Sequence, residues 1–72
     1  MKTDFKPIEL LNRVNECGGD VLFKTKEGDI LNLHSKLSQF VFVSIFSKPE
    51  LLKGAVLEIM DDEDKKLLAD FL

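Results

Sequence analysis

The 72-residue chain has few of the residues on which several classes of protein depend. One cysteine, Cys17, excludes an intramolecular disulfide framework and a zinc site built from several thiolates. One histidine, His34, excludes a histidine pair for metal binding or proton relay. No run approaches the roughly 20 apolar residues of a membrane span, and no apolar signal-peptide core follows Met1. We therefore expect a cytoplasmic protein that does not associate with membranes.

Positive charge is also scarce. Ten Lys and Arg stand against thirteen Asp and Glu, which gives a net charge of −3. Sequence-independent binding to nucleic acid depends on clustered positive charge, so this balance argues against a general polyanion binder. Most of the negative charge lies near the end of the sequence, at Glu58 and in the run from Asp61 to Asp64.

What is present favours a folded domain. The chain is 44% hydrophobic and contains six Phe, whereas disordered chains are poor in aromatic and branched apolar residues. Its length suits one domain over residues 1–72, with a small core.

The first element expected is a helix over residues 7–17. Ile8, Leu11 and Val14 recur at three-residue spacing and make one apolar stripe. Gly18-Gly19 follows and is expected to end the helix in a left-handed conformation.

Residues 21–26 and 30–34 are expected to form a β-hairpin. Residues such as Val21 and Phe23 alternate with others such as Lys24 in both stretches, which is the period of a half-buried strand. Gly28 lies between the two stretches and supplies the positive φ of a tight turn.

Residues 35–47 are expected to form a second helix with Ser35 as its N-cap. The alternative is a strand over residues 40–46, where β-branched and aromatic residues dominate. The helix is favoured because no turn signal precedes Phe40. Four of its apolar residues share one face: Leu37, Phe40, Val41 and Ile45.

A single helical turn over residues 49–53, a third strand over residues 55–60 and a final helix follow. Asp61 or Asp62 is expected to cap this helix. Its residues Leu67, Leu68 and Phe71 are expected to pack on the sheet or on the first helix. The order α-β-β-α-β-α predicts an α+β domain in which helices cover a three-stranded sheet, made of the β-hairpin plus one strand.

No combination of residues points to catalysis, a cofactor or a metal ion. His34 is expected to be a surface or capping side chain. Cys17 closes a helix, where the helix dipole disfavours a thiolate, so it is interpreted as a small core residue. The carboxylates from Asp61 to Asp64 are contiguous and enter a helix, which suits capping better than calcium binding. We therefore expect a protein that is not an enzyme.

The second helix carries most of the functional information. It has more apolar surface than a small sheet can cover on one side, notably at Phe40, Phe42, Val43 and Phe46. Either the flanking helices bury these residues, or they form an interface with another protein or with a second copy of the chain. A protein-interaction or self-association domain is the leading hypothesis.

The alternative hypothesis is an accessory protein that binds nucleic acid. Lys24 and Lys26 lie on one side of the hairpin, and Lys36 is close in sequence. Lysines on the solvated face of a strand are ordinary, so the interaction domain is favoured.

Two families share short stretches with this chain. The first resemblance lies in Gly19-Asp20-Val21 and in Glu27-Gly28-Asp29-x-Leu31-Asn32-Leu33-x-Ser35-Lys36-Leu37-Ser38-Gln39. These stretches resemble a group of short uncharacterised proteins from Gram-positive bacterial genomes and mobile elements, which have no established activity. This resemblance implies a stand-alone bacterial domain with no catalytic residue.

The second resemblance is to BTB/POZ domains, which are dimerisation and adaptor modules. The similar features are Asp20-Val21-Leu22-Phe23, His34, Phe42-x-x-x-Phe46, Leu57-Glu58-Ile59 and Leu67-Leu68-Ala69-Asp70-Phe71-Leu72. The segment between His34 and Phe42 is shorter here than in that family. The resemblance implies a similar architecture only.

Overall fold

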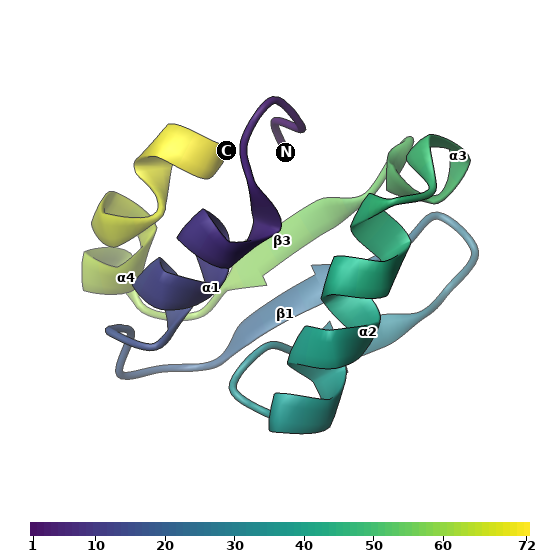
Figure 1. Ribbon diagram of the computed structural model, residues 1–72. Coiled ribbons are helices and arrows are strands. Elements are labelled where there is room, and N and C mark those ends of the chain that lie inside the picture. Colours follow the sequence, from purple (N-terminus) through teal and green to yellow (C-terminus); the bar gives the residue numbers. More distant parts are fainter.

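The helices and strands of the protein follow the predicted order around one antiparallel sheet, as the computed structural model in Figure 1 shows. All 72 residues are described. The elements are α1 (Pro7–Val14), β1 (Val21–Lys24), β2 (Ile30–Asn32), α2 (Lys36–Phe46), α3 (Pro49–Leu52), β3 (Val56–Ile59), α4 (Asp62–Leu67) and a final 3-10 turn, η1 (Ala69–Phe71). The α+β class is therefore confirmed, and residues 40–46 are helical rather than extended.

The sheet has the strand order β2-β1-β3, and both pairings are antiparallel. Phe23 in the central strand lies opposite Leu31 on one side and Leu57 on the other. These three side chains therefore share the inner face of the sheet. The β1–β2 turn contains Gly28 at φ 99°, which confirms the predicted hairpin.

Both longer helices cover this inner face of the sheet (Figure 1). Phe42 of α2 meets Phe23 of β1 edge to face, with the ring centroids 5.0 Å apart. Such a pair adds about 0.5–1.5 kcal/mol to the free energy gained from burial alone. A single buried cluster of thirteen apolar residues results: Leu10, Leu11, Val14, Cys17, Val21, Phe23, Leu33, Phe42, Leu52, Ala55, Ile59, Leu68 and Phe71.

The outer face of the sheet is not covered by a helix (Figure 1). Lys24 lies there and forms an ion pair with Glu58 of β3. Its paired neighbours Ile30 and Val56 are exposed on the same face.

The two ends of the chain lie side by side (Figure 1). The backbone N–H of Lys2 donates to the carbonyl of Phe71 at 2.9 Å. The Phe5 ring packs against the rings of Phe46 and Phe71, with centroids 5.1 and 4.7 Å away.

The predicted end of the first helix is wrong in two respects. α1 stops at Val14, and Cys17 lies beyond it in the following turn. Gly18 and Gly19 do not adopt positive φ. Instead, their backbone N–H groups donate to the carboxylate of Asp64, at 3.2 and 2.8 Å. Only Gly19 approaches α4 so closely that a Cβ atom would be crowded, and neither glycine forms a left-handed helix end.

The structure shows the orientation of α2 and corrects one expectation about the C-terminal segment. α2 turns Phe42 into the core, and of the four residues predicted to share a face, Leu37, Phe40 and Val41 are exposed while Ile45 packs against the core. The reason is that Phe42, one position away from that face, packs against the buried Phe23 ring. Leu68, which follows α4, and Phe71, in η1, are buried as predicted, whereas Leu67 at the end of α4 is exposed.

Candidate interaction surface

The solvent-exposed face of α2 is unusually apolar for a small protein. The side chains of Leu37 and Phe40 are 74% and 76% exposed, and Val41 and Val43 are also exposed. Ile8 of α1 is exposed beside the same helix. We call these five residues the α2 surface. They are half of the ten large apolar side chains that the protein leaves exposed.

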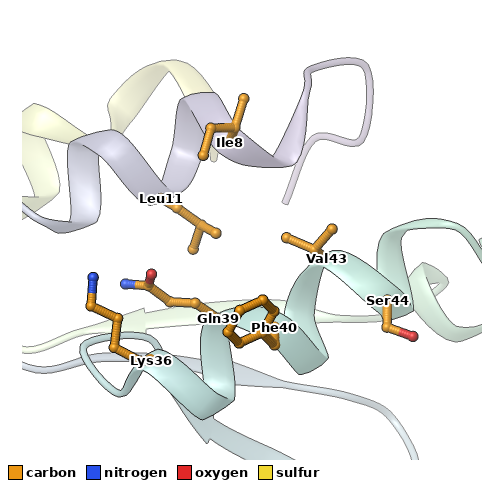
Figure 2. A pocket seen from close by; sticks show the side chains of 7 residues that line it. All are labelled: Ile8, Leu11, Lys36, Gln39, Phe40, Val43 and Ser44. Carbon is orange, nitrogen blue, oxygen red and sulfur yellow. The ribbon is translucent and has the colours of Figure 1, made fainter.

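A groove of about 460 Å³ runs between α1 and α2. Figure 2 shows Leu11 of α1 pointing toward α2, and Lys36 and Val43 of α2 pointing toward α1. Seven residues line the groove: Ile8, Leu11, Lys36, Gln39, Phe40, Val43 and Ser44. Lys36, at one end of the groove, is the one charged residue among them, and four of the seven are apolar.

Local hydrogen bonds hold α2 in this orientation. Ser35 is the N-cap, and its side chain accepts from the Ser38 N–H, as predicted. The Gln39 amide donates to the Leu33 carbonyl at 2.8 Å and to the Asn15 side chain at 3.2 Å. Gln39 therefore links α2 both to the end of the hairpin and to the end of α1.

The four predicted interface residues divide into two pairs. Phe40 and Val43 are exposed on the α2 surface. Phe42 is 0% exposed, and Phe46 is half-buried against Phe5 and Phe42. Phe42 is therefore a core residue and no longer an interface candidate, because no partner can reach it.

The sequence does not indicate that three members of the α2 surface are exposed. Helical spacing places Leu37 and Val41 on one face with Phe40, but it does not show that this face meets solvent. Ile8 belongs to the apolar stripe predicted for the first helix, yet α1 packs through its buried residues Leu10, Leu11 and Val14. A helix that is apolar nearly all round gives no periodic signal for which side faces solvent.

The three lysines proposed for nucleic-acid binding do not come together. Lys24 lies on the outer face of the sheet, where its charge is paired with Glu58. Lys36 lines the groove between the two helices that cover the opposite face. Lys26 follows β1, and its exposed side chain lies beside Gly54. One phosphate backbone would not meet all three charges on a shared surface.

Three further titratable groups singled out by the sequence, His34, Cys17 and Asp61, have structural explanations. His34 Nε2 lies 2.7 Å from the Gly19 carbonyl. Burial raises the pKa of the Cys17 thiol above its ordinary value, and the Asp64 carboxylate raises it further. The Asp61 side chain caps α4 by accepting from the Glu63 N–H at 2.8 Å.

No group of three or more His, Cys, Asp or Glu side chains is arranged to hold a metal ion. None of the helices has the length and apolar character required to cross a membrane. No match to this chain was found among family models, curated proteins or solved structures.

Proposed function

We propose that this chain is a non-enzymatic protein-interaction domain and that the α2 surface binds its partner. The observation that carries the proposal is the exposure of Leu37 and Phe40, one helical turn apart, on a helix whose opposite face is already in the core. Exposing two large apolar side chains in this way costs free energy in water, because apolar surface is stabilised by about 25 cal/mol for each Å² that is buried.

The composition of this surface suits a binding site. Interface centres are depleted in charged residues and enriched in aromatic ones. Phe40 is aromatic and protrudes, while the groove beside it offers an apolar recess. The outer face of the sheet is a poorer candidate, because the ion pair of Lys24 and Glu58 lies between its exposed apolar residues Ile30 and Val56.

Photo-crosslinking in cells that make the protein tests this proposal. A photoreactive phenylalanine analogue replaces Phe40 in one variant and Val56, on the outer face of the sheet, in the control. We expect a discrete protein adduct from position 40 and none from position 56. Absence of any adduct from position 40, with both variants folded, would overturn the proposal.

A further inference from the structure

We infer that the occupant of the α2 surface is a second copy of this chain, with the two α2 helices packed antiparallel across a two-fold axis. This inference rests on the proposed function and names its partner. In such an isologous contact the same surface must complement itself, so each residue on it needs a suitable neighbour from the same set.

The exposed side of α2 is self-complementary in size. Leu37, Phe40, Val41 and Ser44 follow the spacing i, i+3, i+4, i+7 of a helix-packing stripe. When two such helices run antiparallel with the axis between residues 40 and 41, Leu37 of one copy lies opposite Ser44 of the other. Phe40 then lies opposite Val41. A larger side chain meets a smaller one at every position, which lets the helices approach closely.

Charge also favours the antiparallel arrangement. Lys36 is in the first turn of α2, at the positive end of the helix dipole, and this turn has no acidic residue. The last turn of α2 has no basic residue, so the negative end of the dipole is not neutralised within its own helix. Antiparallel packing brings Lys36 of each copy toward that negative end of the other. Parallel packing would place the two Lys36 side chains together.

An interface of standard size would require α1 as well as α2. A standard interface buries about 800 Å² on each partner, which is about a sixth of the 4530 Å² surface of this chain. The exposed stripe of an 11-residue helix is narrow. The groove widens it, because the exposed side chain of Ile8 in α1 lies beside Val43 on the same side of the molecule (Figure 2). Phe40, at the edge of the groove, is placed to enter the groove of the other copy.

Sedimentation equilibrium on the purified full chain at tens of micromolar tests the assembly. We expect a dimer for the wild type and a monomer for Phe40→Asp. The matched control is Val56→Asp, which adds the same charge at a half-exposed site on the opposite face and should remain a dimer. Circular dichroism checks that both variants are folded. A wild-type monomer, or a Phe40→Asp dimer as tight as the wild type, would overturn the inference.

Disulfide trapping tests the orientation. Single variants Leu37→Cys and Ser44→Cys are made in a Cys17→Ala background, then oxidised mildly alone and as a mixture. We expect the covalent dimer in the mixture and little from either variant alone. Efficient trapping of Leu37→Cys with itself would show parallel packing, and a dimer with no trapping in the mixture would place the contact elsewhere. If Cys17→Ala folds poorly, Cys17 is retained, because its thiol is buried.

The two proposals fail in different ways. A strict monomer in solution that still forms an adduct with a different protein from position 40 would overturn the homodimer and leave the interaction domain intact. A monomer that forms no adduct would overturn both.

Discussion

The carboxylate of Asp64 accepts the backbone N–H of Gly19 at 2.8 Å through one oxygen, and its other oxygen accepts from the preceding residue. Asp64 belongs to the first turn of α4 and is 4% exposed, whereas Gly19 lies in the loop between α1 and β1. One side chain thus holds together two segments that are 45 residues apart in sequence. Hydrogen bonds of an ionised acceptor are roughly twice as strong as neutral ones.

Asp64→Asn is therefore expected to destabilise the protein by about 1–3 kcal/mol. The amide of asparagine keeps one acceptor but directs an NH₂ group toward the second backbone N–H, so one hydrogen bond is lost. Urea unfolding at neutral pH measures the change. Asp62→Asn is the matched control, since that carboxylate is exposed, and its effect should stay below about 1 kcal/mol. Equal effects of the two substitutions would contradict this account.

Gly19→Ala is expected to be more harmful than Gly18→Ala. A Cβ atom at residue 19 would lie 3.1 Å from Asp64 Oδ2 and 3.3 Å from the Asp61 Cβ. Relieving this crowding displaces the carboxylate, and overpacking of this kind costs about 1–3 kcal/mol. A Cβ at residue 18 meets nothing within 4 Å. Thermal melting of both variants decides the matter, and equal midpoints would show that Asp64 can move without loss.

Phe71→Ala is expected to leave the protein largely unfolded at room temperature. Its ring is buried, meets the Phe5 ring edge to face at 4.7 Å and lies 5.7 Å from the Arg13 guanidinium. Truncating a buried Phe costs about 3–5 kcal/mol, which equals the whole stability expected for so small a domain. Leu72→Ala, at the exposed neighbouring residue, is the control. A Phe71→Ala protein that melts within a few degrees of wild type would show that this ring is peripheral.

Alkaline pH is expected to destabilise the fold through Cys17. Burial raises the pKa of this thiol in the folded protein, and Asp64 and Glu16 raise it further. The folded state therefore keeps the proton at a pH where the unfolded thiol, with a pKa of about 8.5, has lost it. The stabilisation is complete below the unfolded pKa and is lost as pH rises through the folded pKa.

Urea unfolding at a series of pH values above neutral measures this effect. Wild type should lose stability more steeply than Cys17→Ala, which retains every lysine as an internal control. Parallel slopes for the two proteins would mean that the thiol titrates alike in both states.

Local patterns predicted those parts of the fold that depend on neighbouring residues. The two-residue alternation around Phe23 and the glycine at the turn identified the hairpin, because burial of one sheet face leaves a period of two. The helix caps Ser35 and Asp61 also depend only on neighbouring residues, because a capping side chain bonds to the first turn of its own helix.

Contacts between distant segments could not be predicted in this way. The face that α2 turns toward the sheet depends on where the Phe23 ring lies. A helix with apolar residues on all sides does not show in its sequence which face this is. The hydrogen bonds from Gly18 and Gly19 to Asp64 join a loop to a helix that lies far along the chain. The sequence therefore indicated α2 as the apolar helix, but it did not distinguish the buried Phe42 from the exposed Leu37 and Val41.

The contact between the two ends of the chain gives the fold a ring-like connectivity. Because Lys2 bonds to Phe71 and the Phe5 ring packs there too, the first and last segments are neighbours although the backbone does not join them. We therefore expect a circular permutant, with the present ends linked and new ends cut at the exposed turn around Gly28, to keep the core and the helices of the native protein.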